Sequence, residues 1–591
     1  MSGRSRHHRP RRGIGVWAPQ RERVEVEAGG GVHAMRRDED GWWWSEHLPL
    51  DHGDRYAFRV EGSEPLPDPR SRWQPEGVNG PSAVYEHDRF GWTDTAWTGR
   101  PLPGAVVYEL HVGTYTAAGT LDAAAARLDH LVELGVTHVE LLPMAAFDGT
   151  HGWGYDGVHL GAVHAPYGGP DALKRFVDRA HALGLAVILD VVYNHLGPSG
   201  NHLARFAPYF TDAHQTPWGP AVNLDAPGSD EVRRWIVDNA VQWLRDFHID
   251  GLRLDAVHAL VDERARHLLE ELSDEVDALS AALNRPLTLI AESDLNDPRM
   301  VTPREAGGFG IHAQWSDDFH HALHTLLTGE RQGYYGDFGT IGTLAQTLTR
   351  VFLHEGSWSS FRGRHHGRPV DRERTAGWRF LGYLQDHDQV GNRAVGDRIS
   401  ASLSQGRVRI GAALVLTAPF TPMLFMGEEW AASTPWQFFS SFPDPDLGRA
   451  VSEGRRGEFS RHGWDAEEVP DPQDPATRDA SVLRWEEREA PGHAAVLAWY
   501  RDLIALRRAR PELTDPRLAA VRCDLDEDAG WLVVHRGGLR VVVNLADAGR
   551  SVPLDAPVRE VLLASAEGIP PGGTDLAMPP ESVVIVEVAA G

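Results

Sequence analysis

The sequence of 591 residues predicts an α/β protein, a (β/α)8 TIM barrel with a β-sandwich before it and an antiparallel β-sandwich after it. Three observations support this prediction. Short alternating runs precede residue 85, strand and helix patterns alternate from about 101 to 430, and strand patterns return near the C-terminus. The expected parts are a disordered basic tail at 1–12, an immunoglobulin-like sandwich with its linker at 13–100, the barrel at 101–516 and a C-terminal sandwich at 517–591.

Charge and composition narrow the kinds of partner that this chain can have. A formal net charge of −26 leaves no basic surface to neutralise phosphates, so we expect no nucleic acid. No run of about eighteen apolar residues is present, so we expect no membrane span. The lone Cys523 can form no internal disulfide, and no apolar stretch follows the basic N-terminus, so we expect a cytoplasmic protein.

The region before residue 85 is predicted to be all-β. Alternating runs at 15–19, 24–26, 41–44 and 56–60 are separated by Gly, Asp and Pro. The Trp triplet in the third run predicts a sheet core with one exposed ring, and a sugar platform is the alternative. Residues 66–82 are rich in Pro and Gly, which predicts a linker or a loop laid against the next region.

Strands alternate with helices from about 101 to 430. The pattern over 171–183 predicts a helix that follows Pro170, and a second helix is expected to begin with Ser229 as its N-cap. A doubly wound sheet would have a glycine-rich turn after its first strand, and residues 109–113 do not form one. Eight strand–helix units therefore predict a closed barrel. The expected strands are Val106–His111, His138–Pro143, Ala186–Val192, Gly251–Val257, Thr288–Ser293, Ala313–Ser316, Phe380–Gln385 and Pro422–Met426.

The last part of the chain predicts loops, one helix and a second sandwich. Residues 431–492 are rich in Pro, Ser and acids, which is typical of long loops on top of a barrel. Apolar residues at helical spacing predict a helix around 496–506. The strands expected after it are 530–535, 539–544, 559–563 and 582–588.

The octapeptide Gly251–His258 is the centre of the functional prediction. Leu252 and Leu254 share one face of a short strand, whereas Arg253 and Asp255 share the other. The cation favours the ionised form of the neighbouring acid. A structural ion pair inside a barrel explains this octapeptide as well as a catalytic acid does, so the other strand ends must decide.

Four predicted strands deliver an acid near their carboxyl ends, which is where the active sites of such barrels lie. Strands three, four, five and seven supply Asp190, Asp255, Glu292 and Asp388. A solvated rim of loops also collects acids, but it rarely places each one directly after an apolar strand. We therefore interpret these acids as a catalytic set.

The chemistry of acetal cleavage assigns a role to each acid. It needs a proton donor for the leaving oxygen and a nucleophile or base for the anomeric carbon. Glu292 follows the apolar segment 289–291, which favours its protonated form and a role as general acid. Asp255 is then the nucleophile, and Asp388 stabilises positive charge on the sugar. Acids on adjacent strands predict the ~5–5.5 Å separation of retaining enzymes.

Residues beside these acids are expected to bind the sugar. His195 and His387 would donate hydrogen bonds to it, and Tyr155 would stack beneath its ring. His258, three residues after the nucleophile, would face the sugar of the leaving group.

Structural roles remain open for several of these positions. Asp190, His258 and Trp153 could equally be packing groups. Asp318 and Glu428 lie near the ends of strands six and eight and are expected to cap helices rather than to reach outer sugar subsites. No acid cluster with calcium-ligand spacing follows strand three, so we expect no metal ion and no cofactor.

Together these segments resemble a known family. Asp190–His195, Gly251–His258, Glu292 and His387–Gln389 match, in order, the four signature regions of the α-amylase superfamily, glycoside hydrolase family 13. The resemblance implies a retaining reaction on α-glucans with Asp255 as nucleophile, Glu292 as acid/base and Asp388 as transition-state stabiliser. The residues that we expect around them to bind substrate are Tyr155, Asp190, His195, Arg253, His258, His387 and Gln389.

Further segments resemble the trehalose-releasing members of that family. They are Leu66–Ser82, Glu292–Arg299, Gln314–His321 and Gln385–Arg393. This resemblance implies hydrolysis, by water, of the α-1,4 bond next to a terminal trehalose unit on a malto-oligosaccharide. The stretch 436–442 departs from the pattern of those members, so the resemblance assigns no residues to the reducing-end subsites.

Two other functions stay open at this point. One is a branching or debranching enzyme of the same family, although branching enzymes usually have Asp-Glu where this chain has Asp388-Gln389. The other is a glycan-binding protein with a catalytically silent barrel. The presence of the complete set of acids argues against a catalytically inactive barrel.

Overall fold

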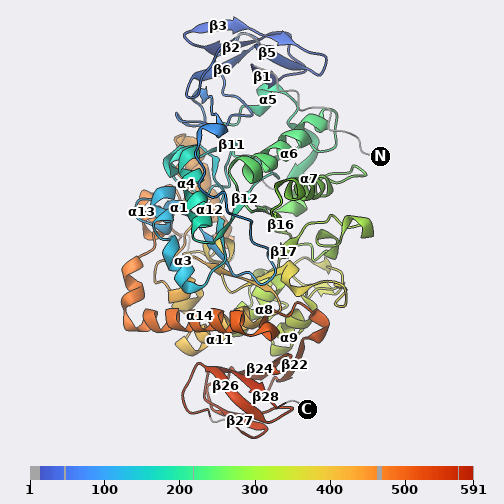
Figure 1. Ribbon diagram of the computed structural model, residues 1–591, viewed down its shortest axis with the longest axis vertical. Coiled ribbons are helices and arrows are strands. Elements are labelled where there is room, and N and C mark those ends of the chain that lie inside the picture. The colour runs from blue at the N-terminus through green and yellow to red at the C-terminus, as the bar shows by residue number, and fades with distance from the viewer. Residues whose placement is uncertain (1–12, 46–47, 217–218, 462–468, 570–571, 590–591) are drawn as a thin grey trace.

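The computed structural model describes residues 13–45, 48–216, 219–461, 469–569 and 572–589. The predicted basic tail at 1–12 lies outside these residues. Figure 1 shows three regions stacked along the long axis, with β-sheets at each end and the barrel between them. No helix within the described ranges is long and apolar enough to cross a membrane.

The N-terminal region consists of two small sheets, as the alternating runs predict. One has the order β1-β5-β4, formed by Ile14–Trp17, Trp42–Ser45 and Arg36–Arg37. The other has the order β3-β2-β6-β7, formed by Gly31–Ala34, Val24–Ala28, Arg55–Val60 and Ser82–Ala83. Strand β2 alternates buried and half-buried residues, because every second side chain faces the core between the sheets.

The Pro- and Gly-rich segment 66–82 is a loop laid against the barrel. Arg70 donates a hydrogen bond of 2.9 Å to Asp238 of a barrel helix. The His159 ring lies 2.9 Å from the carbonyl oxygen of Val78. The segment therefore fixes the first region on the barrel.

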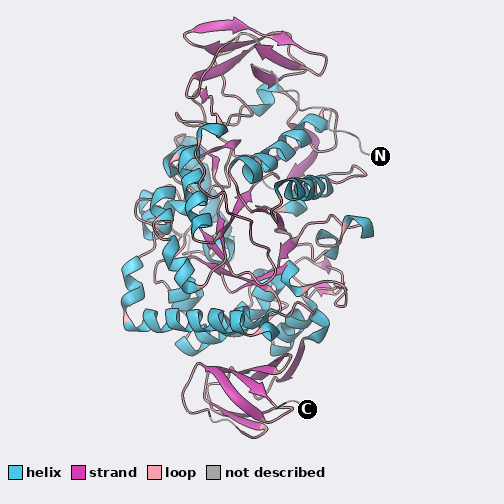
Figure 2. Cartoon of the chain, viewed as in Figure 1, coloured by secondary structure: helices cyan, strands magenta, loops and turns pink. Residues whose placement is uncertain are grey.

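All eight expected barrel strands are present, and they close into one parallel barrel (Figure 2). In chain order they are β8 Val107–Leu110, β9 His138–Leu141, β12 Ala186–Val191, β15 Gly251–Leu254, β16 Thr288–Ala291, β17 Ala313–Trp315, β20 Phe380–Tyr383 and β21 Thr421–Phe425. Pairing of β21 with β8 completes the ring. Because all strands are parallel, their carboxyl ends meet at one face.

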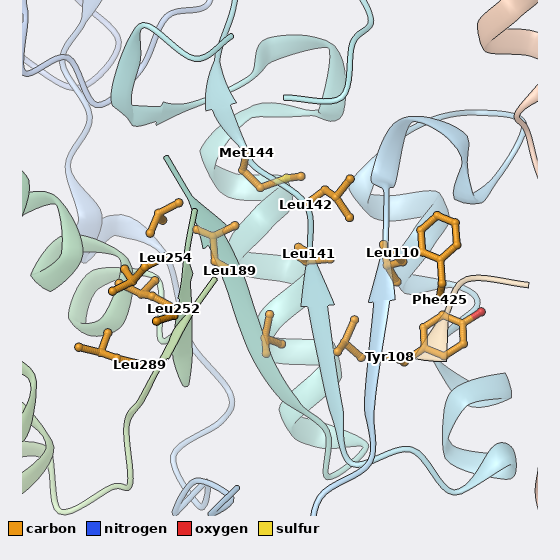
Figure 3. Packing of buried hydrophobic residues seen from close by; sticks show 14 of the residues in the cluster. Tyr108, Leu110, Leu141, Leu142, Met144, Leu189, Leu252, Leu254, Leu289 and Phe425 are labelled. Atoms are coloured by element: carbon orange, nitrogen blue, oxygen red, sulfur yellow. The ribbon is translucent and has the colours of Figure 1, made fainter. Parts of the chain in front are cut away.

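Alternate residues of the strands face opposite sides of the barrel wall. Leu252 and Leu254 belong to the main core, and Figure 3 shows them near Leu189 and Leu289 of the neighbouring strands. A separate small cluster contains Ile188, Ile290, Trp315, Leu381 and Met423 and fills the interior of the barrel. Arg253 lies on this interior side, with its guanidinium carbon 4.3 Å from the centre of the Trp315 ring.

The helices differ from the expectations in detail. Helix α4 is Gly169–Ala182, so Pro170 lies within its first turn, where the missing N–H costs nothing. Helix α6, Ser229–Asp246, has Gly228 as its N-cap, so the prediction of Ser229 as the cap was wrong. Gly228 has a φ of +88°, and this left-handed backbone favours glycine over serine.

The segment 431–492 is not only loop. It contains α12 (Pro445–Arg461) and α13 (Pro475–Ala480). Proline at the first turn suits both helices, and Asp474 caps α13 by accepting from the N–H of Ala476 at 2.9 Å. The Pro-rich composition marks helix starts here, which is why an expectation of loops was wrong.

The C-terminal strands form the expected antiparallel sheets. Helix α14, Pro491–Ala509, precedes them and packs beside α11, Gln405–Thr417. The larger sheet has the order β22-β23-β24-β28-β26, formed by Arg522–Asp526, Trp531–Arg536, Leu539–Asn544, Ser582–Val588 and Val558–Ala564. A two-stranded sheet pairs β25 (Arg550–Pro553) with β27 (Asp575–Met578).

Candidate active site at the carboxyl ends of the barrel strands

Asp255 follows the last residue of β15 and is held from both sides. Arg253 Nη1 donates to Asp255 Oδ1 at 2.8 Å, and Asn194 Nδ2 donates to Asp255 Oδ2 at 2.7 Å. Arg253 is fully buried, and its Nη1 also donates to Asp190 Oδ2 at 2.8 Å. These bonds fix the carboxylate that the sequence proposes as nucleophile and leave its side chain 11% exposed.

The backbone turns sharply after Asp255. Ala256 has a φ of +39°, which is uncommon for a residue with a Cβ atom. In this conformation the N–H of Ala256 donates a hydrogen bond to Glu292 Oε2. The strained turn therefore links the two proposed reacting acids.

Glu292 follows the last residue of β16 in a mostly buried position. Arg253 Nη2 lies 3.7 Å from Glu292 Oε2, so one guanidinium contacts both Asp255 and Glu292. Burial raises the pKa of Glu292 well above its usual value; Arg253 opposes this effect, while Asp255 and Asp388 add to it. A carboxyl group in these surroundings is suited to donate a proton near neutral pH.

Asp388 is in the first turn of α10, His387–Gly391, the next helix after β20. Asn392 Nδ2 donates to its Oδ1 at 3.1 Å, and its Oδ2 lies 3.4 Å from His387 Nε2. Its side chain is 38% exposed, the most accessible of the three acids. The Gln389 side-chain oxygen accepts from the Tyr334 hydroxyl at 3.3 Å.

Hydrogen bonds through Tyr155 join Asp190 to His387. The Tyr155 hydroxyl donates to Asp190 Oδ2 at 2.6 Å and lies 2.7 Å from His387 Nε2. The rings of Tyr155 and His387 are stacked, with centres 5.2 Å apart, so His387 covers one face of the tyrosine expected beneath the sugar. Burial raises the pKa of Asp190 to about 6, although Arg253 opposes the shift.

The two remaining histidines of the predicted site, His195 and His258, have different partners. His195 lies 3.1 Å from the carbonyl oxygen of Tyr155 and also contacts Asn194. Burial lowers the pKa of His195, which favours a neutral ring. His258 is 27% exposed, with Nδ1 3.8 Å from Asp294 Oδ1.

Three positions with open roles have structural contacts. Trp153 stacks on Trp436 with ring centres 5.4 Å apart. Asp318 accepts hydrogen bonds from the backbone of Leu353 and the side chain of Asn296, and Glu428 accepts from the Tyr500 hydroxyl at 2.8 Å. Asp318 therefore holds a distant loop, and the expectation that it caps a helix was wrong.

The sequence interpretation missed Glu109, Asn194 and Asp317. Asn194 holds Asp255, and Asp317 accepts a hydrogen bond from Tyr383 and lies close enough to Glu292 to raise its pKa. Asn194 lies in the segment Asp190–His195 that the sequence analysis singled out, and its position next to His195 could have indicated a role in the site. The signal for Glu109 was an acid inside an otherwise apolar strand.

The protonation of His387 makes stability depend on pH. Burial alone would lower the pKa of His387, but Asp388 and Glu109 raise it from 6.5 to about 10. Because the pKa of His387 is higher in the folded protein than its ordinary value, its protonation stabilises the fold. This contribution is fully present below pH 6.5 and is lost as the pH rises through about 10. We expect resistance to denaturant to fall across this range and to fall less in His387→Gln. An equal dependence of the unfolding free energy on pH in the parent protein and in His387→Gln would contradict a raised pKa of His387.

The barrel and its converging acids define a glycoside hydrolase of the α-amylase type. The family model of the alpha amylase catalytic domain matches residues 85–214, and a domain of unknown function, DUF3459, matches 516–585. A crystal structure of a candidate alpha amylase from Salmonella typhimurium has a TM-score of 0.89 and 37% sequence identity, covering 98% of this chain and 97% of the other.

Curated relatives narrow the class further. A malto-oligosyltrehalose trehalohydrolase of Rhizobium sp. (strain M-11) is 53% identical over 97% of each chain. Another, of Arthrobacter ramosus, is 57% identical over 91% of this chain and 93% of the relative. The chain belongs to the malto-oligosyltrehalose trehalohydrolase family.

Proposed function

We propose that this chain is a retaining glycoside hydrolase that releases trehalose from malto-oligosyltrehalose by cleaving the α-1,4 bond next to the terminal trehalose unit. The observation that supports the chemistry best is the buried Arg253. Its guanidinium contacts Asp190 and Asp255 at 2.8 Å and Glu292 at 3.7 Å. Two carboxyl groups that contact one guanidinium support a retaining mechanism, in which such groups lie about 5–5.5 Å apart.

In the first step Asp255 attacks the anomeric carbon of the glucosyl unit. Glu292 gives its proton to the bridging oxygen, the glycosidic bond breaks, and trehalose leaves with that proton. Asp255 is then bonded covalently to the remaining glucan. Asp388, the most exposed of the three, stabilises the positive charge that develops on the ring.

In the second step water replaces trehalose. Glu292, now ionised, takes a proton from the water, whose oxygen attacks the anomeric carbon and releases Asp255. The raised pKa of Glu292 supports both roles, because the group must give and regain a proton in each cycle.

The remaining site residues are proposed to orient the sugar. Arg253 holds the Asp255 carboxyl group in place, while Asp190 and Tyr155 link Arg253 to His387. The residues proposed to touch the sugar are Tyr155, His195, His258, His387 and Gln389.

Product analysis tests this function directly. Purified protein given a trehalose-capped malto-oligosaccharide should release free trehalose and the shortened glucan. Release of glucose or maltose alone would contradict the proposal. New branch points in the product would identify a branching enzyme, and binding without turnover would identify a glycan-binding protein. The uncapped malto-oligosaccharide of the same length is the matched control, which we expect to be a poorer substrate.

A further inference from the structure

Glu109 contacts the site from a strand that supplies none of the three acids. It is on β8, is 1% exposed, and meets His387 twice. The backbone N–H of His387 donates to Glu109 Oε2 at 2.9 Å, and His387 Nδ1 lies 2.6 Å from Glu109 Oε1. Two contacts to one residue fix both the orientation of the ring and the start of the helix that holds Asp388.

The hydrogen bonds around the ring determine which of its nitrogens carry protons. Arg253 and the Tyr155 hydroxyl both donate to Asp190 Oδ2, at 2.8 and 2.6 Å, so the single proton of Tyr155 is already used. The tyrosine oxygen, 2.7 Å from His387 Nε2, must then accept from that nitrogen. On the other side the Glu109 carboxylate accepts from Nδ1. Both ring nitrogens act as donors, which only the charged imidazolium can do.

We propose that Glu109 is a positioning residue that keeps the His387 ring doubly protonated and held between Tyr155 and Asp388. This inference rests on the proposed glycosidase function and adds one residue to it. Glu109 does not touch the sugar; it acts through the histidine. Its charge, rather than its size, is what the site requires.

Charged and titratable groups face His387 from several strands. They are His111 and Glu109 at β8, Glu140 on β9, Asp190 on β12, Arg253 on β15, and Asp386 and Asp388 on its own segment. Of these, Asp388 and Glu109 oppose the effect of burial most strongly and bring the pKa of His387 to about 10. Glu109 Oε1 lies 2.6 Å from Nδ1 of the ring, whereas Asp388 Oδ2 lies 3.4 Å from Nε2.

Glu140 offers a matched contrast on the adjacent strand. It is the register partner of Glu109 and is also 1% exposed. Within the part of the chain that the structure describes, neither of its carboxyl oxygens has a hydrogen-bond partner. Burial, together with Glu109 and Asp190, raises the pKa of Glu140 well above its usual value. The surroundings of Glu140 therefore favour its protonated, neutral form, and its loss as an ionisable group should change little.

The test compares Glu109→Gln with Glu140→Gln, since each removes an ionisable group and keeps the size of a buried side chain. The protonation of His387 is followed by NMR in protein labelled with 15N-histidine, and its signal is identified by its absence in His387→Gln. Trehalose release gives kcat and KM across pH, and melting temperatures report folding.

We expect the parent protein and Glu140→Gln to keep a doubly protonated ring up to about pH 9. In Glu109→Gln the ring should lose its second proton about 1–3 pH units lower. At about pH 8, kcat of Glu109→Gln should be roughly 100-fold lower with little change in KM, because a misplaced catalytic geometry costs about this much. Glu109→Asp, which keeps the charge, should titrate within about one unit of the parent.

An unchanged His387 titration in Glu109→Gln, or equal shifts in both Gln variants, would overturn the proposal, even if kcat falls. If Glu109→Gln does not fold, Glu109→Asp decides. A ring that titrates near 6.5, the ordinary histidine value, in the Asp variant would overturn it as well. The titration needs no turnover, so a parent protein that releases no trehalose would refute the proposed function without touching this result.

Discussion

Replacing Asp255 by Asn is expected to lower kcat for trehalose release by about 10⁴-fold or more, because the bond to the anomeric carbon can no longer form. The fold should survive, since an amide of the same shape can still accept the hydrogen bond that Arg253 donates at 2.8 Å. Trehalose release measured under single-turnover conditions and the melting temperature check the two expectations separately.

A matched control removes an acid of the same type from the surface. Asp129 on α3 (Leu128–Leu134) is 61% exposed and pairs with Arg179 at 3.0 Å. Exposed pairs contribute about 0–1 kcal/mol, so Asp129→Asn should match the parent in kcat and nearly in stability. Turnover by Asp255→Asn within about tenfold of the parent would remove the nucleophile assignment.

Replacing Glu292 by Gln is expected to slow cleavage of the natural substrate by about 10²–10⁴-fold, because trehalose would leave as an unprotonated alkoxide. A maltosyl fluoride is the informative second substrate. Fluoride leaves without a proton, so formation of the covalent intermediate should be slowed far less. Since Glu292 also activates water, the intermediate should accumulate in the variant and be detectable by mass spectrometry on the peptide that contains Asp255.

The two substrates make this prediction specific to an acid/base role. Equal losses on the capped oligosaccharide and on the fluoride would show that Glu292→Gln damages the site in general. The pH profile gives an independent check. Because burial raises the pKa of Glu292, the parent should lose activity as the pH rises through that raised value, and Glu292→Gln should lack this limb.

The barrel could be predicted because its strands are local features. Each one is a run of apolar and β-branched residues between helical patterns, and all eight appear at the expected places. Helix boundaries were less certain, since Gly228 and Ser229 are both acceptable at an N-cap until the backbone angle is known. The segment 445–461 was mistaken for loop because proline and acids are common both in loops and in the first turn of helices.

The sequence by itself determined the architecture, the strand ends at which the acids occur, and the alternation that places Arg253 and Asp255 on one face. These features follow from the side-chain periodicities of strands, about two residues, and of helices, about 3.6 residues, which can be recognised in the sequence alone. Only the tertiary structure decided that Glu109 bonds to His387, 278 positions away, that Asn194 holds Asp255, and that the turn at Ala256 reaches Glu292. Such contacts depend on how strands close into a barrel and how loops pack above it, and no local pattern encodes them.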